Sequence, residues 1–92
     1  MDTKDQDIAS QIVDNVFATG KGHVRFRNRN RQFYTLDVVA SSMKVTETWN
    51  YGGLGSSAGT WTFDAGGAQE LHGRILYRLQ DGFKVAGTPK YG

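Results

Sequence analysis

The first periodic segment of the chain is amphipathic at helical spacing. Between residues 5 and 18 the apolar side chains recur three and four positions apart, at Ile8, Ile12, Val13, Val16 and Phe17. Polar side chains fill the intervening positions, so this 3.6-residue period predicts a helix with one buried face. Thr3 followed by Gln6 resembles a capping box, and Gly20 and Gly22 predict where the helix ends.

From His23 the period changes to two, which indicates strands. The alternation predicts a β-hairpin with a three-residue loop at 28–30, in which Arg27 pairs with Arg31 and Val24 with Tyr34. One face of this hairpin is apolar and is expected to face the core: Val24, Phe26, Tyr34, Leu36 and Val38. The other face is mostly basic: His23, Arg25, Arg27, Arg31 and Phe33.

Residues 43–51 and 60–63 are rich in β-branched and aromatic side chains and predict a third and a fourth strand. The segment between them, residues 52–59, is glycine-rich and polar, and is expected to be a mobile hairpin loop. The large rings flanking this loop share one parity: Trp49, Tyr51, Trp61 and Phe63. We expect this aromatic stripe to be core, with an exposed interaction patch as the alternative.

Residues 64–80 allow two interpretations. Ala68, Leu71, Ile75 and Leu79 recur at helical spacing, whereas Leu71, Ile75, Tyr77 and Leu79 also share the parity of a strand. The length of the segment favours a helix, as do the end signals, with Asp64 as N-cap and Gly82 as stop. Residues 83–85 predict a last short strand, and residues 86–92 are expected to form a flexible tail.

These elements predict an α+β fold: an N-terminal helix, an antiparallel meander of three to four strands and a C-terminal helix, in one domain over residues 1–85. A chain of 92 residues with 38% apolar and 22% charged side chains suits one small globular domain. The chain has no cysteine, which excludes disulfides and thiolate chemistry. No apolar run approaches the length of a membrane span, and the polar N-terminus is unlike a secretory signal, so we expect a cytoplasmic protein with no membrane partner.

The net charge of +2 hides a segregation of acidic and basic side chains along the chain. Residues 1–20 contain four aspartates and one lysine, whereas residues 21–31 contain four arginines, one lysine and no acid. The remaining residues carry five basic and five acidic side chains. Such a basic block predicts contact with an anionic partner.

The basic block supplies the candidate binding residues. Planar guanidiniums with asparagines between them suit phosphates and base edges, and nearby rings suit base stacking. The candidates are Lys21, His23, Arg25, Arg27, Asn28, Arg29, Asn30, Arg31 and Phe33. The leading hypothesis is therefore a protein that contacts nucleic-acid phosphates or a nucleoprotein complex. A solvated sheet face, whose charges prevent edge-to-edge aggregation, is the plainer interpretation.

A second hypothesis assigns the same arginines to an acidic protein surface, as in a small phage- or plasmid-encoded inhibitor or adaptor. The acidic first helix, with Asp5, Asp7 and Asp14, could also neutralise the arginines of a second copy, which leaves a homodimer open.

Catalysis has little support, so we expect a non-enzymatic protein with no catalytic residue, metal or cofactor. The glycine-rich segment from Gly53 matches GxGxxA, but a strand-like run follows it where a dinucleotide site needs a helix. His23 and His72 lack metal-ligand spacing. A serine at 41 or 42 with His23 and Asp37 can be written as a triad, yet no nucleophile elbow accompanies it.

Overall fold

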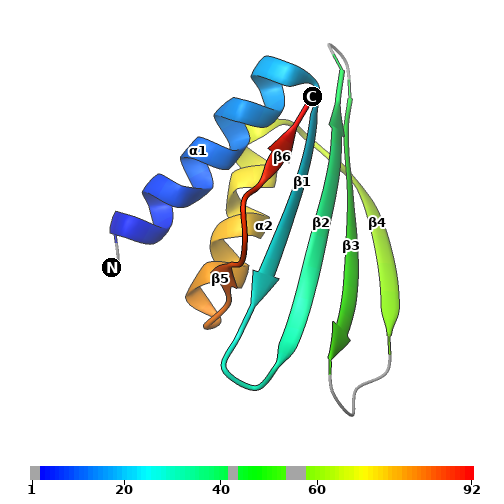
Figure 1. The fold of residues 1–92 in the computed structure, drawn as a ribbon. Helices are drawn as coiled ribbons and strands as arrows, with labels where there is room; N and C mark the ends of the chain where they lie inside the picture. Colours follow the sequence, from blue (N-terminus) through cyan, green and yellow to red (C-terminus); the bar gives the residue numbers. More distant parts are fainter. Residues whose placement is uncertain (1–2, 42–43, 54–57) are drawn as a thin grey trace.

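The computed structural model describes residues 3–41, 44–53 and 58–92. The α+β class is confirmed: a helix at each end of a meander of four long strands, with two short strands after the second helix. The elements are α1 (Thr3–Thr19), β1 (Lys21–Arg27), β2 (Gln32–Ala40), β3 (Val45–Gly53), β4 (Gly59–Ala65), α2 (Ala68–Gln80), β5 (Lys84–Val85) and β6 (Lys90–Tyr91). Both helices lie on one side of the sheet, which leaves the other side uncovered (Figure 1).

The sheet is antiparallel, with strand order β4-β3-β2-β1-β5, and β6 also pairs with β1. Alternate side chains of the strands therefore point to the helices or to the open face. The helix-facing set includes Val24 and Phe26 on β1, Leu36 on β2 and Trp49 on β3, all at most 1% exposed. The two-residue period thus predicts correctly which hairpin side chains enter the core.

The predicted pairing of the first hairpin is wrong by two residues. Arg27 pairs with Phe33 rather than Arg31, and Val24 pairs with Leu36 rather than Tyr34. A shift of two keeps the side chains of both strands on their predicted faces, because the period of a strand is two. Arg31, predicted on the basic face, lies in the loop instead. Arg27 and Arg31 are therefore not directly opposed in this register.

The hairpin loop is longer than predicted because Asn28 organises it. The Asn28 carboxamide oxygen accepts from the backbone N–H groups of Asn30 at 3.0 Å and Gln32 at 3.1 Å. The backbone N–H of Asn28 also donates to the backbone carbonyl oxygen of Gln32 at 3.1 Å. The chain closes through Arg31, whose φ of 61° lies in the left-handed region that asparagine and glycine favour. The loop therefore spans 28–31.

The core lies between the helices and the sheet. The N-terminal helix contributes Ile12, Val13 and Val16, and the C-terminal helix contributes Leu71, Ile75 and Leu79, at the predicted helical spacing. Full burial of one such aliphatic side chain contributes roughly 1.5–3 kcal/mol. Neither helix combines the length and apolar character needed to cross a bilayer, within the part of the chain that the structure describes.

The ambiguous segment forms the helix α2, but Asp64 is not its N-cap. Asp64 lies within β4, where its carboxylate accepts from the Thr46 hydroxyl at 3.2 Å, and the residue at the N-cap position is Gly67. The predicted stop is confirmed at Gly82, whose φ is 101° and whose N–H donates to the Leu79 carbonyl at 3.3 Å. The segment also satisfies the parity of a strand, because helix-face positions four residues apart, such as Leu71 and Ile75, fall on the same face of a strand as well.

The C-terminal residues make contacts that the sequence pattern does not predict. Tyr91 pairs with Gly22 and Lys90 with His23 as β6 lies against β1. A Cβ atom on Gly22 would lie 2.5 Å from Val16 and 3.4 Å from Tyr91, so glycine lets the helix, strand and tail meet. Burial also raises the pKa of Tyr91. The mobility expected for residues 86–92 stays a prediction.

The third and fourth strands are confirmed and pair in register, Trp49 with Trp61 and Glu47 with Phe63. The strand β4 follows the GxGxxA match, so no helix stands where a dinucleotide site would need one. Residues 54–57, on which the prediction of a mobile loop mainly rests, lie outside the described residues.

Candidate functional site

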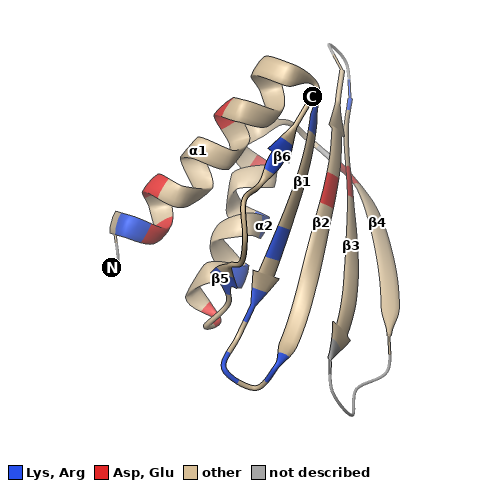
Figure 2. Ribbon diagram, in the orientation of Figure 1, with Lys and Arg blue, Asp and Glu red and all other residues tan. Residues whose placement is uncertain are grey.

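The open face of the sheet gathers basic side chains along β1. Alternate β1 residues from Lys21 to Arg27 are exposed, because the residues between them are buried against the helices. The C-terminal strands add two cations in register, since Lys84 pairs with Arg27 and Lys90 with His23. We call Lys21, Arg25, Arg27, Lys84 and Lys90 the basic strip. Figure 2 shows the blue of lysine and arginine on β1, β5, β6 and the turn to β2.

Within the described residues, no ion pair neutralises the basic strip. No described carboxylate lies within 4.0 Å of its side-chain nitrogens. The neighbouring acid on the open face, Asp37, is engaged by His23, whose Nδ1 lies 2.5 Å from the Asp37 carboxylate. His23 is therefore held by an acid, while about half of its side chain stays exposed, at 51%. The strip keeps its positive charge and is available to an external anion.

Phe33 forms an exposed aromatic platform beside the strip. Its ring lies over Gly52, where an added Cβ would be 2.8 Å from the ring, and the residue is 37% exposed. The Arg25 guanidinium carbon lies 5.7 Å from the ring centroid. A nucleobase could stack on this ring while the arginines beside it contact phosphates.

The hairpin tip extends the positive surface. Arg29, Asn30 and Arg31 are exposed, whereas Asn28 is half-buried and its side chain is used within the loop. Eight of the nine sequence candidates are thus exposed on the open face or at the tip, and the ninth, Asn28, is half-buried in the loop. Asn28 has a structural role that accounts for its presence without a ligand.

The part of the open face formed by β3 and β4 is polar and largely neutral. Side chains of β3 and β4 form hydrogen bonds between the two strands in three rows: Thr46 with Asp64, Thr48 with Thr62, and Asn50 with Thr60. Lys44 at the end of these rows lies 3.5 Å from the Asp64 carboxylate. Positive charge on the sheet is therefore concentrated at the β1 side.

The aromatic stripe is not part of the open face. Trp49 is 1% exposed and belongs to the core, as expected, whereas Trp61 is 44% exposed although it lies on the helix-facing side. Tyr51 and Phe63 are half-buried. The exposed ring is thus separated from the basic strip by the thickness of the sheet.

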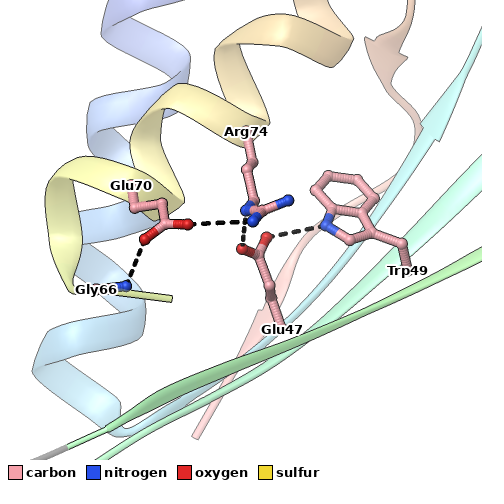
Figure 3. Close-up of polar contacts among 5 residues, drawn as sticks. All are labelled: Glu47, Trp49, Gly66, Glu70 and Arg74. Atoms are coloured by element: carbon pink, nitrogen blue, oxygen red, sulfur yellow. Dashed lines mark hydrogen bonds and ion pairs between the residues drawn. The ribbon is translucent and has the colours of Figure 1, made fainter. Parts of the chain in front are cut away.

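A buried polar cluster beside the stripe was missed by the sequence analysis. Glu47 is fully buried, with its carboxylate 2.9 Å from the Trp49 indole nitrogen, which donates to it, and 2.6 Å from Arg74 Nε (Figure 3). Burial raises the pKa of Glu47, while the Trp49 hydrogen bond and the charge of Arg74 act in the opposite direction. The signal in the sequence was parity, because Glu47 shares the core-facing parity of Val45 and Trp49.

Arg74 also reaches Glu70, as the i,i+4 spacing predicts, with nitrogen and oxygen 3.1 Å apart. Glu70 also accepts from the Gly66 N–H. The hydrogen bond from the Gly66 backbone, and to a lesser extent the one from Arg74, hold the pKa of Glu70 below its ordinary value. Arg74 thus joins a buried and an exposed carboxylate, and its guanidinium carbon lies 4.2 Å from the Phe63 ring centroid.

The catalytic triad that can be written with Ser41 is not assembled among the described residues. His23 and Asp37 do pair, but the Ser41 hydroxyl donates to the Lys44 carbonyl at 3.2 Å. Four residues of extended strand separate Ser41 from Asp37, which corresponds to about 14 Å. His72 lies elsewhere, 3.2 Å from the Ser10 hydroxyl between the two helices. Ser42 lies outside the described residues.

Comparison with known proteins gives no match to a family model, a curated protein or a solved structure.

Proposed function

We propose that this protein binds nucleic acid, with the basic strip on the phosphates and Phe33 beneath a base. The observation that carries the proposal is the alignment of Lys84 and Lys90 with Arg27 and His23. Three segments that are separate in sequence, β1, β5 and β6, contribute cations to one side of one sheet. A surface that needed charge only for solubility has no reason to concentrate it in this way.

The geometry supports a single strand more than a duplex. An exposed ring beside a row of cations suits an unpaired base with phosphates on either side, and such stacking tolerates any base. Arg25 and Arg27 are two residues apart on β1, so their α-carbons are separated by about 7 Å along the strand. The exposed arginines at the tip, Arg29 and Arg31, lengthen the path that a phosphate backbone could follow.

The test is fluorescence anisotropy with labelled single-stranded RNA and DNA of about twelve nucleotides, a length within the range of known single-strand site sizes. We expect binding that weakens in Arg27→Ala and in Phe33→Ala. The matched control is Lys44→Ala, which also removes one positive charge but lies at the end of the polar rows, near β4. Lys44 directly precedes β3, and two strand spacings separate β3 from β1, or about 10 Å.

A selective loss in Arg27→Ala would support the strip as the binding surface. Equal loss in Arg27→Ala and Lys44→Ala would refute it, because only net charge would then matter. Absence of binding at low salt would remove nucleic acid as the partner and leave an acidic protein surface as the target of the same arginines.

A further inference from the structure

The two edges of the sheet are protected very differently. On the β1 side the outer strands β5 and β6 have two residues each, contain Lys84 and Lys90, and are separated by a segment that ends in Pro89. Short length, lysine and proline are features by which edge strands avoid pairing with another chain. The strand β4, GTWTFDA, has seven residues and neither lysine nor proline.

The outer side of β4 is also regular and unpaired. It pairs with β3 one residue to one over 59–65, so no bulge bends it there. No described strand pairs with its other side (Figure 1). The backbone of β4 can therefore accept a further strand.

An exposed aromatic ring lies at this edge. Trp61 is 44% exposed on the helix-facing side of β4, and its inner side contacts Tyr34 and Tyr51, with ring centroids 6.5 and 6.3 Å away. The next ring on that side of β4, Phe63, is half-buried beside a hollow of about 470 Å³ that Tyr77 of α2 also lines. An apolar surface next to an unpaired strand is typical of an interaction site.

We propose that the outer edge of β4 pairs with β4 of a second copy of the chain, antiparallel and about a two-fold axis at Thr62. Thr62 is the middle residue of β4, so this register pairs all seven residues. Thr62 then lies opposite the partner's Thr62, and Thr60 opposite the partner's Asp64. On the helix-facing side, Trp61 lies opposite the partner's Phe63, and the same contact occurs twice.

The register is complementary in charge and in shape. Asp64 is the charged residue of β4, and Lys44 of its own chain lies 3.5 Å from it. The two Asp64 carboxylates are four residues of strand apart, about 14 Å, which exceeds the screening length at physiological salt. Threonine with threonine and ring with ring are also the pairs that β4 already makes with β3, Thr62 with Thr48 and Trp61 with Trp49.

A two-fold pairing also accounts for the difference between the two edges. It uses the outer side of β4 in both copies, so the joined sheet ends only at the edges that β5 and β6 protect. The two basic strips are then seven strand spacings apart, about 34 Å, so their like charges do not oppose association.

A single cysteine tests the register, because the chain contains none of its own. Thr62→Cys places the cysteine opposite itself at the axis, with α-carbons about 5 Å apart, within the range of a disulfide. Oxidation should therefore give a covalent dimer on non-reducing electrophoresis. Thr60→Cys is the matched control: Thr60 is also exposed, but its two copies are about 14 Å apart and should not cross-link.

Sedimentation equilibrium measures the dimer without a cross-link. We expect reversible conversion of the 10.2 kDa chain to twice that mass at micromolar concentration, since one strand edge and its rings make a small interface. Thr62→Lys should raise the dissociation constant about tenfold or more, because it opposes two lysines at the axis. Thr48→Lys is the control: it removes the same Thr48–Thr62 hydrogen bond and adds the same charge, but its copies are about 14 Å apart.

Trp61→Ala should weaken the dimer as well, through the loss of two ring contacts. Near-ultraviolet circular dichroism checks its fold, and Thr62→Lys, at an exposed position, gives the answer independently if Trp61→Ala is unfolded.

Three results would overturn the proposal. One is a chain that stays at 10.2 kDa up to about 500 µM, well above the range of a specific weak dimer. Another is cross-linking of Thr60→Cys as readily as of Thr62→Cys. The third is a dimer that persists in Thr62→Lys but dissociates in Arg27→Ala, which would place the contact at the basic strip.

Discussion

Removal of Arg74 should produce a pH-dependent loss of stability, because it leaves Glu47 buried without its cation. Arg74→Met keeps a long apolar side chain over Phe63 but removes the charge 2.6 Å from the Glu47 carboxylate. An unpaired buried carboxylate escapes the cost of charge by taking up a proton. The ordinary pKa of this carboxyl is 4.5, which sets its behaviour in the unfolded chain.

The cost can be bounded from that value. Holding a proton at pH 7 on a group with an unfolded pKa of 4.5 costs about 3.4 kcal/mol, at 1.36 kcal/mol per pH unit. At pH 5 the same cost is about 0.7 kcal/mol. The sign follows from proton binding: the folded variant binds the proton and the unfolded chain releases it, so stability falls as pH rises. Relative to the wild type, the variant should thus lose up to about 2.7 kcal/mol more at pH 7 than at pH 5.

Urea denaturation at pH 5, 6 and 7 measures this difference. The control is Arg74→Met combined with Glu47→Gln, in which the amide still accepts from Trp49 but cannot titrate, so the pH dependence should disappear. A loss in Arg74→Met that is equal at all three pH values would refute the reasoning. It would mean that the Glu47 carboxylate remains solvated or finds another partner.

Other predictions concern the loop of the first hairpin, the packing at two glycines and the C-terminal segment. Asn28→Ala should lose about 1–2 kcal/mol of unfolding free energy, since two backbone N–H groups of the loop lose their acceptor; an unchanged urea midpoint would contradict the loop assignment. Gly22→Ala should lose about 1–3 kcal/mol through its clash with Val16, whereas Gly73→Ala, with no atom nearby, should gain about 1 kcal/mol of helix stability; equal thermal shifts would contradict this. The amide of Ala86, which donates to the Arg25 carbonyl at 2.8 Å, should exchange more slowly than that of Thr88; uniformly fast exchange over 84–92 would favour the wholly mobile tail that the sequence predicts.

The elements were predictable because their periods are strong. The spacing of Ile12 and Val16 defines a helix face, and the alternation from Val24 to Val38 defines which strand residues are buried. The helical interpretation of residues 64–80 was correct because its length and its stop at Gly82 outweighed a parity that strands also satisfy. Local pattern was sufficient wherever one face had to be buried.

The errors arose where a single side chain overrides the local pattern. Parity cannot distinguish registers that differ by two, and the Asn28 side chain selected the longer loop. Asp64 looks like a helix cap in sequence, yet its position opposite Thr46 depends on β3. The contribution of Lys84 and Lys90 to the basic strip depends on pairing between chain ends that are about 60 residues apart, which no local period encodes.

Arg74 and Arg78 of α2 illustrate the same limit. Charged side chains at i,i+4 spacing usually face water, so the sequence pattern alone predicts a solvated helix face for both. In the structure both stack on rings of the sheet, Arg74 on Phe63 and Arg78 on Tyr34. Their surroundings follow from the packing of α2 across β3 and β4, which is a tertiary contact.

The central claim is that the basic strip contacts phosphates, and the salt dependence of single-strand binding tests it most directly. Each phosphate contact to a single strand contributes about 0.7 to the slope of log K against log salt concentration, so five strip cations predict a slope of about −3.5. In Arg25→Ala with Arg27→Ala the slope should fall to about −2. A wild-type slope near zero, or one that the double variant leaves unchanged, would contradict the account.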